Sequence, residues 1–178
     1  ADNRGGMREV VRYLVGRGRR RIALILEPLR VSSTEERYQG YCDALTEAGL
    51  PVNNDGVFSS RQCFYENGRL CAEKLLKSSL NFDAVACHTD TTAVGVLHYL
   101  AEKGVRVPDD IAVTGFNDDP TTATVVQPKL TTGRINVPEM GRQAVRLLLE
   151  QLERLDRGLA ANVTHVSVPV DLVVRESA

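Results

Sequence analysis

Long apolar runs and an excess of charge of one sign are both missing from this sequence. No stretch approaches the roughly 20 consecutive apolar residues that a membrane helix requires. The 22 Lys and Arg residues are balanced by 23 Asp and Glu residues, which gives a net charge of -1. A near-neutral chain lacks the basic surface that binds the phosphates of nucleic acid. We therefore expect this chain to contact neither a membrane nor DNA directly.

Cysteine motifs are missing as well. The chain has four cysteines, but none forms a C-x-x-C pair and no histidine lies at metal-ligand spacing from them. A chain of 178 residues, 43% of them apolar, can bury a core without disulfide or metal staples. We expect neither a zinc site nor a disulfide framework, and no metal or other cofactor. The cysteines are expected to be small buried apolar residues: Cys42, Cys63, Cys71 and Cys87.

Catalytic signatures are also absent from the sequence. There is no G-x-S-x-G elbow, no G-x-x-x-x-G-K-[ST] loop and no G-x-G-x-x-G run after a strand pattern. The acidic pair Asp109-Asp110 follows Pro108 directly before a strand pattern, which is typical of a turn. We therefore expect no enzymatic activity. A small hydrolase-like or metal-dependent enzyme is the weakest alternative, because no nucleophile-base pair is recognisable.

Continuous apolar runs alternate along the chain with apolar stripes of helical period. Continuous apolar runs predict buried parallel strands at 22–26, 84–87 and 111–116. Weaker strand patterns lie at 57–58, 130–135 and 166–174. Pro169 interrupts the last of these, which indicates a sheet edge or a crossing point.

Stripes of period 3.6 predict amphipathic helices between the strands, at about 6–15, 33–49, 91–103 and 138–156, and another helix that carries Cys71, Ala72, Leu75 and Leu76. The Ser33-x-x-Glu36 pattern predicts a capping box at the start of the second helix. Alternating strands and helices with short links predict the α/β class: a doubly wound parallel sheet with helices on both faces.

Polar side chains follow three of the predicted strands. Arg37 lies in the helix after the first strand, and Thr89 and Asp90 follow the strand that ends at residue 87. Asn117 follows the strand that ends at residue 116. Open α/β sheets bind ligands beyond the carboxyl ends of their strands. A guanidinium, a hydroxyl, a carboxylate and an amide suit a ligand rich in hydroxyl groups, because each hydroxyl both donates and accepts.

Each of these side chains also has a purely structural interpretation. Asp90 is as well suited to cap the helix that follows as to contact a ligand. The run 117–120, Asn-Asp-Asp-Pro, is equally compatible with turn chemistry alone. Arg37 has Glu35 and Glu36 as neighbours for a surface ion pair. The ligand-site interpretation depends on the agreement of three strand ends, since no single residue carries it.

Several segments resemble a known family. They are T-D-T-T-A-V-G at 89–95, G-V-R-V-P-D-D-I-A-V-T-G-F-N-D at 104–118 and P-K-L-T-T at 128–132. The segments R-Y-Q-G-Y-C-D-A-L at 37–45 and V-P-x-x-L-V-V-R at 168–175 match as well. Together they resemble the lac/galactose repressor family of bacterial transcription factors over nearly the whole chain. The segment at 37–45 is closest to the galactose-repressor-like members.

The resemblance implies a bacterial regulator with a two-lobed, periplasmic-binding-protein-like effector module. A small molecule, usually a sugar or a nucleobase compound, would bind in the cleft and change operator affinity. By position, Arg37 matches the effector-contacting arginine, and Thr89 and Asp90 match the polar pair after the middle strand. Asn117 takes the place of the first acidic residue in the usual G-[FY]-D-D.

This sequence departs from the family pattern at three positions. Asn117 replaces an aspartate, so a ligand hydroxyl would meet an amide rather than a charge. Thr89 stands where asparagine is common. Cys63 falls where an aromatic side chain often packs against the ligand, with Phe64 beside it. We therefore expect the ligand to differ from that of close relatives.

The same resemblance implies a division of the chain. Residues 1–134 would form the C-terminal lobe, 135–165 a helical segment of the N-terminal lobe, and 166–178 a closing strand and tail. We expect a fragment, because no helix-turn-helix head is recognisable, and operator DNA would be bound only through such a head. The apolar stripe of the last helix predicts association with a second copy, hence a homodimer. The expected location is the cytoplasm.

A second function class stays open at this point. A sugar-binding protein of a transport system has the same fold but a different task, and the chain would then be a fragment of such a protein. An upstream DNA-binding head would support the regulator, and an upstream secretion signal would support the transporter.

Overall fold

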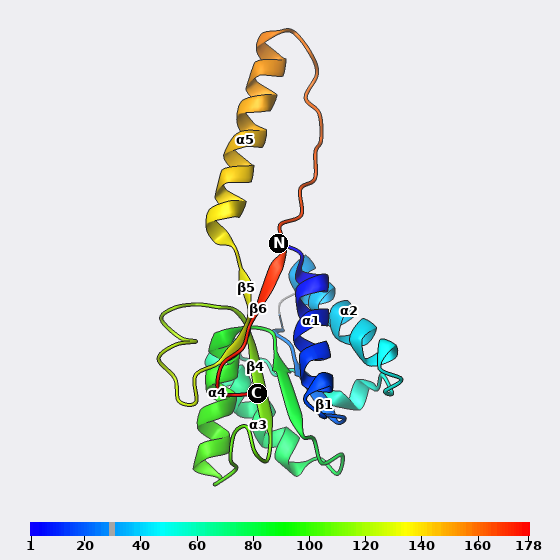
Figure 1. Ribbon diagram of the computed structural model, residues 1–178, viewed down its shortest axis with the longest axis vertical. Coiled ribbons are helices and arrows are strands. Elements are labelled where there is room, and N and C mark those ends of the chain that lie inside the picture. Colours follow the sequence, from blue (N-terminus) through cyan, green and yellow to red (C-terminus); the bar gives the residue numbers. More distant parts are fainter. Residues whose placement is uncertain (29–30) are drawn as a thin grey trace.

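A six-stranded sheet forms the centre of the computed structural model, which describes residues 1–28 and 31–178. Its strand order is β2-β1-β3-β4-β5-β6 (Figure 1). The strands are β1 Ile22–Ile25, β2 Val57–Phe58, β3 Ala84–Cys87, β4 Ala112–Asn117, β5 Thr131–Ile135 and β6 Val170–Val173. Neighbouring strands from β2 to β5 run parallel, and β6 pairs antiparallel with β5.

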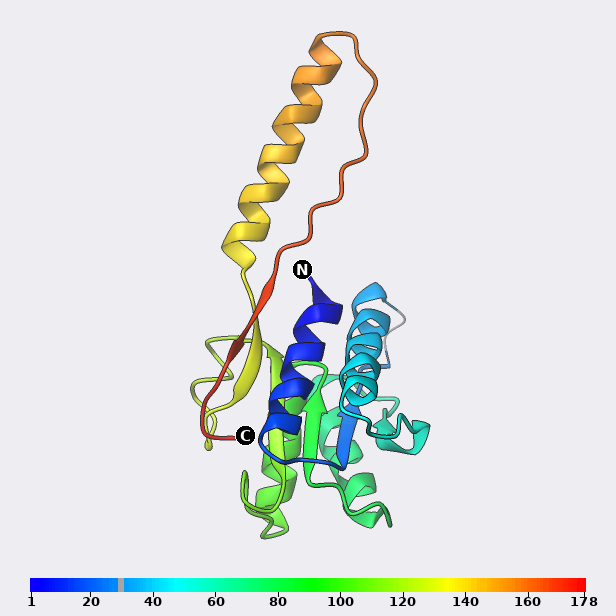
Figure 2. The same ribbon diagram turned by 45° about the vertical axis from the view of Figure 1, so that its right-hand side comes forward.

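Helices cover both faces of this sheet (Figures 1 and 2). The four covering helices are α1 Asn3–Gly16, α2 Ser32–Glu47, α3 Phe64–Lys77 and α4 Asp90–Glu102. Alternate residues of each strand face opposite layers. Leu24 and Ala86 pack in the cluster with α1 and α2, whereas Ile25 and Val85 pack in the cluster with α3 and α4. The predicted α/β fold with a doubly wound sheet is confirmed.

The edge strand β6 differs from the expectation of a wholly parallel sheet. It comprises four residues and begins directly after Pro169, which has no N–H to donate to a ladder. The chain leaves β5 at its carboxyl end and returns to the same end, where Val170 lies opposite Ile135. A strand that enters at that end has to run antiparallel, so the sheet is parallel from β2 to β5 and antiparallel at its β6 edge.

The starts of α1 and α2 differ from the predicted ones. α1 begins at Asn3 rather than near residue 6, because the Asp2 carboxylate caps it by accepting the Gly5 N–H at 2.8 Å. α2 begins at Ser32, and its N-cap residue Val31 makes no side-chain cap. The predicted capping box from Ser33 was therefore wrong.

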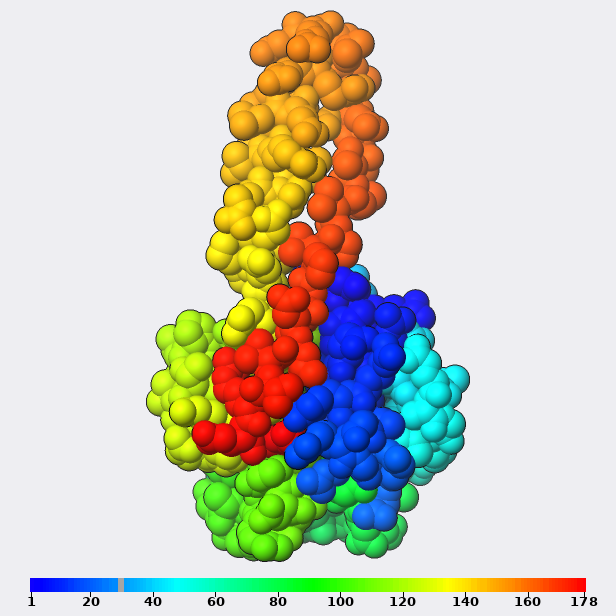
Figure 3. Space-filling model, viewed as in Figure 1, coloured from blue at the N-terminus to red at the C-terminus, as the bar shows by residue number. Residues whose placement is uncertain are grey.

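The last helix, α5 Val137–Asp156, projects from the body (Figure 3). Asn136 caps its start, and none of its residues is buried. Segment 157–169 leads back from its far end to the sheet (Figure 1). The apolar stripe predicted for this helix is uncovered along one side, at Val145, Leu148, Leu149, Leu152 and Leu155. Among the described residues, no helix is both long and apolar enough to cross a membrane.

A pair of glycines allows α3 and α4 to approach closely. A Cβ atom built on Gly95 would lie 2.1 Å from the Tyr65 carbonyl oxygen, and one on Gly68 would lie 2.1 Å from the Thr92 carbonyl oxygen. The crossing therefore requires glycine on both helices.

We predict that Gly95→Ala lowers the free energy of unfolding by about 1–3 kcal/mol, because the helix backbones must separate. Gly141→Ala is the matched control: its Cβ would meet nothing within 4 Å, so no loss is expected. Urea unfolding followed by circular dichroism measures both. Equal stability of Gly95→Ala and the wild-type chain would contradict the close crossing.

Candidate functional site

Arg37 is the most deeply buried arginine at the carboxyl ends of the central strands. It projects from the first turns of α2, and only 5% of its surface is exposed. Its Nε and Nη2 donate to Asn3 Oδ1 at 3.0 and 2.9 Å. Nη1 donates to the carbonyl oxygen of His88, directly after β3, and Nη2 to Asn117 Oδ1 at 3.3 Å, at the end of β4. One side chain thus joins α1, α2, β3 and β4.

The charge of Arg37 is not neutralised by a direct partner. Among the residues that the structure describes, no carboxylate forms a salt bridge with it, and its hydrogen-bond acceptors are neutral oxygens. The Phe116 ring lies 4.0 Å from the guanidinium carbon. Burial lowers the pKa of Arg37 to about 10, against the opposing influence of Asp90 and then Glu36. The interpretation of Arg37 as half of a surface ion pair was therefore wrong.

The end of β4 has an unusual backbone. Asn117 has φ 114° and Asp118 has φ 58°, and both belong to the left-handed region that disfavours side chains. Such strain persists only where surrounding contacts hold it, and it often marks functional sites. The next residues form a turn that is closed by a side chain, since the Asp119 carboxylate accepts the Thr121 N–H at 2.8 Å. The structure thus shows a turn whose first residue reaches Arg37.

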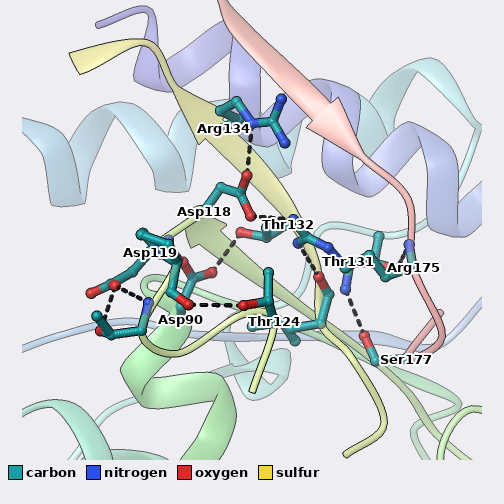
Figure 4. A network of polar contacts seen from close by, with 12 residues as sticks. Asp90, Asp118, Asp119, Thr124, Thr131, Thr132, Arg134, Arg175 and Ser177 are labelled. Carbon is teal, nitrogen blue, oxygen red and sulfur yellow. Dashed lines mark hydrogen bonds and ion pairs between the residues drawn. The ribbon is translucent and has the colours of Figure 1, made fainter. Parts of the chain in front are cut away.

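Asp118 holds this loop against the edge of the sheet (Figure 4). Its carboxylate lies 2.7 Å from Arg134 Nε in β5 and 2.7 Å from Arg175 Nη2 after β6. Arg175 also donates to the Leu130 carbonyl oxygen at 2.7 Å. The strand that leads to α5 and the segment that returns from it are therefore fastened next to Asn117.

Asp90 is enclosed rather than open to the edge of the sheet. It is 1% exposed, and its oxygens accept the Asp119 N–H at 2.7 Å and the Thr132 hydroxyl at 2.5 Å (Figure 4). Burial raises the pKa of its carboxyl group. The N-cap of α4 is Thr89, whose hydroxyl accepts the Thr92 N–H at 3.1 Å. The alternative interpretation of Asp90 as the cap was therefore wrong. One Asp90 oxygen thus holds the loop after β4, and the other holds strand β5.

Cys63 and Phe64 lie at the start of α3. Cys63 is half-buried and occupies the N-cap position without a side-chain cap, and Phe64 has φ 55° and a half-exposed ring. The Phe64 N–H donates to Glu27 Oε2 at 2.9 Å, and the Thr92 hydroxyl donates to Glu27 Oε1. A chain of hydrogen bonds therefore runs from Phe64 through Glu27 and Thr92 to Thr89.

Three residues of this site were missed as contacts in the sequence. Asn3 accepts from Arg37 and Glu27 accepts from Phe64, and the third residue, His88, is 5% exposed and accepts from Arg37 through its carbonyl oxygen. Glu27 directly follows the first apolar run, so the strand-end rule selects it as well. The strand-end rule does not select Asn3, because it is the first residue of α1 and comes close to Arg37 only through the packing of α1 on α2. Among the described residues, no cluster of three metal-ligating side chains was found.

A hollow of about 180 Å³ lies at the opposite, amino-terminal edge of the sheet. Tyr41, Phe82 and Leu80 line it together with backbone near Ile22. Its lining is mostly apolar, and the Tyr41 hydroxyl is already used by the Ile22 carbonyl oxygen at 2.8 Å. It offers few free polar groups, so the carboxyl edge is the better candidate site.

Known proteins are similar to this chain in sequence and in fold. Residues 11–178 match the model of a family described as a periplasmic binding protein-like domain. The chain is 35% identical over 176 residues to the HTH-type transcriptional regulator GalR of Salmonella typhimurium, covering 99% of this chain and 50% of that protein. It is 33% identical over 168 residues to the HTH-type transcriptional repressor PurR of Pasteurella multocida, covering 93% and 48%.

Solved structures agree. The transcriptional regulator CelR in complex with cellobiose has a TM-score of 0.88 and 33% identity, over 100% of this chain and 53% of that one. A regulatory protein of the LacI family from Chloroflexus aggregans has a TM-score of 0.88 and 30% identity, over 99% and 61%. The chain belongs to the periplasmic binding protein-like domain family, among its LacI/GalR-type members, which confirms the resemblance found in the sequence. It spans about half the length of the curated relatives it matches.

The buried His88 makes stability depend on pH. Burial, and then the charge of Arg37, lower the pKa of His88 to about 4 from an ordinary value near 6.5. The unfolded chain therefore binds more protons than the folded chain between these values, and stability falls as pH falls from 6.5 to 4.

We predict that His88 accounts for a loss of up to about 3 kcal/mol over this range. In His88→Asn the unfolding free energy should fall less steeply, as measured by urea denaturation at several pH values. His165→Asn, in which an exposed histidine is replaced, should follow the wild-type profile. Identical pH profiles for His88→Asn and the wild-type chain would contradict a neutral buried imidazole.

Proposed function

We propose that this chain is the effector-binding part of a LacI-type bacterial transcriptional regulator. The observation that carries the proposal is the buried Arg37, whose charge meets neutral oxygens at the carboxyl edge of the sheet. A desolvated cation without a carboxylate partner is costly, and it attracts electronegative ligand atoms. The relatives matched over nearly the whole chain are transcriptional regulators, which favours this function over a transport protein or an enzyme.

The proposed ligand is a sugar or a related polyhydroxy compound. Arg37, Asn117 and Thr89 would contact its hydroxyl groups, and Phe64 with Cys63 would pack against its apolar face. Asp90 would act through the loop that it fastens. The relative CelR was solved with cellobiose, and that observation supports a sugar for this chain as well.

The proposed regulator has two lobes, is cytoplasmic and acts as a homodimer. Residues 1–134 would be the C-terminal lobe, 135–165 a segment of the other lobe, and 166–178 the closing strand and tail. In the longer protein a second lobe would cover the apolar side of α5. Operator DNA would be reached through a separate DNA-binding head, because the chain itself is near neutral in charge.

A thermal-shift screen tests the ligand proposal, with cellobiose, D-galactose, D-glucose, sugar phosphates and nucleosides as probes. A probe at about 100 times its Kd should stabilise the chain by roughly 2.7 kcal/mol, which is a clear rise in Tm. Arg37→Met should abolish the rise, because it removes the charge and retains most of the volume. The ligand-free Tm of the variant is measured first, so that only folded protein is compared.

Arg12→Met, which replaces an exposed arginine of α1, is the matched control and should retain the rise. A rise that persists in Arg37→Met would exclude this arginine from the site. No rise with any probe would contradict the proposed ligand class.

The uncovered side of α5 predicts self-association of this chain. At about 100 μM, sedimentation equilibrium should show dimers, because an exposed apolar stripe of this size favours association. Leu148→Glu with Leu152→Glu should give monomers, and the stability of the sheet should change by less than about 0.5 kcal/mol, since both leucines are exposed. A monomeric wild-type chain at this concentration would contradict the prediction.

A further inference from the structure

Glu27 is a buried carboxylate that the proposed ligand contacts do not include. It lies two residues after the end of β1 and is 3% exposed. Three donors point at its two oxygens: the Phe64 N–H at 2.9 Å, Asn67 Nδ2 at 3.4 Å and the Thr92 hydroxyl. In each of these three contacts the neighbouring group is the donor and a Glu27 oxygen is the acceptor, as is usual for a carboxylate.

The contact with Thr92 fixes the direction of a second hydrogen bond. A threonine hydroxyl has one proton, and Thr92 gives its proton to Glu27. The oxygen atoms of Thr89 and Thr92 lie 2.8 Å apart, so Thr89 has to be the donor between them. Thr89 also accepts the Thr92 N–H at 3.1 Å. Its proton is therefore directed inward, and what it retains for a ligand is a lone pair.

The other two polar residues, Arg37 and Asn117, leave donors rather than an acceptor for a ligand. Arg37 has only donors, so Asn117 must turn its amide oxygen toward Arg37 and its NH₂ group away. Nη1 of Arg37 has two protons, and among the described residues it donates to the His88 carbonyl oxygen alone. Arg37 and Asn117 thus retain donors, whereas Thr89 retains an acceptor.

We propose that Glu27 is a positioning residue that sets Thr89 as a hydrogen-bond acceptor, so that the site selects a ligand that donates a hydroxyl proton to Thr89. The same ligand presents oxygen acceptors to Arg37 and Asn117. The proposal rests on the proposed function, since it takes the ligand to be a polyhydroxy compound at this edge. The proposal states which partner donates the proton in each ligand contact, and the identity of the residues alone does not determine this.

Glu27 also has a structural role, because it supplies the cap that Cys63 does not give to α3. Loss of stability in a Glu27 variant is expected on either account and decides nothing. The deciding readout is selectivity between ligand analogues that retain or lose a hydroxyl proton. Replacing a hydroxyl by fluorine removes the donor and leaves a weak acceptor.

The test uses calorimetric titration with cellobiose, D-galactose and their monodeoxyfluoro analogues. For the wild-type chain, fluorine at one ring position should weaken binding about 10-fold or more, because Thr89 then faces no donor. In Glu27→Gln the Phe64 N–H still needs the amide oxygen, so the NH₂ group turns to Thr92 and reverses the chain of hydrogen bonds. Thr89 then donates outward, and the same analogue should lose less than about 3-fold.

Two further variants make the result specific. Thr92→Val removes the link between Glu27 and Thr89, and should also reduce the penalty for fluorine. Glu102→Gln, which removes the charge of an exposed glutamate paired with Arg69, should retain the wild-type penalty. A folded Glu27→Gln that binds the parent sugar with the wild-type penalty would overturn the proposal.

Proton NMR of the ligand-free chain separates this inference from the proposed function. Hydroxyl protons held in buried hydrogen bonds exchange slowly, so Thr89 and Thr92 should each give a resonance that is lost in Thr92→Val. Absence of both resonances would overturn the inward direction of Thr89. If both resonances are present and no sugar binds the wild-type chain, the positioning by Glu27 is supported and the polyhydroxy ligand is wrong.

Discussion

The burial of one guanidinium without a carboxylate partner is the constraint on which this site depends. Arg37 lies where α1, α2, β3 and β4 meet, and each of these elements supplies part of its surroundings. Removing a cation from water is expensive, and neutral hydrogen bonds and an aromatic face offset only part of that cost. The remaining field acts on whatever occupies the carboxyl edge. In the proposed function, a ligand oxygen placed there would complete interactions that the protein leaves incomplete.

The layers of the fold explain why these groups converge. Parallel strands end at one edge of the sheet, and the residues that follow them are brought together from distant parts of the sequence. The backbone at this edge is strained at Phe64, Asn117 and Asp118, all with positive φ. Glu27 holds Phe64, the two arginine pairs hold Asp118, and Asp90 holds the neighbouring Asp119. The enclosed carboxylates thus provide the rigid support, and the residues nearer the edge retain free donors and acceptors.

Much of the fold was predictable because it depends on local patterns. Continuous apolar runs identified β1, β3 and β4, and period-3.6 stripes identified the helices. The direction of β6 was not predictable in this way, since it depends on where the chain returns from α5. The cap of α2 was mispredicted because a capping pattern does not specify its own register. Arg37, Thr89 and Asn117 followed from the strand-end rule, whereas Asn3 required the packing of α1 on α2. The direction of each hydrogen bond required the three-dimensional contacts.

The location of the ligand is the central claim, and NMR chemical-shift mapping tests it most directly. The ¹H–¹⁵N spectrum includes the arginine Nε and the asparagine side-chain amides, so it reports on both edges of the sheet. With cellobiose or D-galactose as the probe, the largest changes should fall on the Arg37 Nε–H and on the Asn117 side-chain amide. Changes concentrated around Tyr41 and Phe82, at the amino-terminal hollow, would contradict the account.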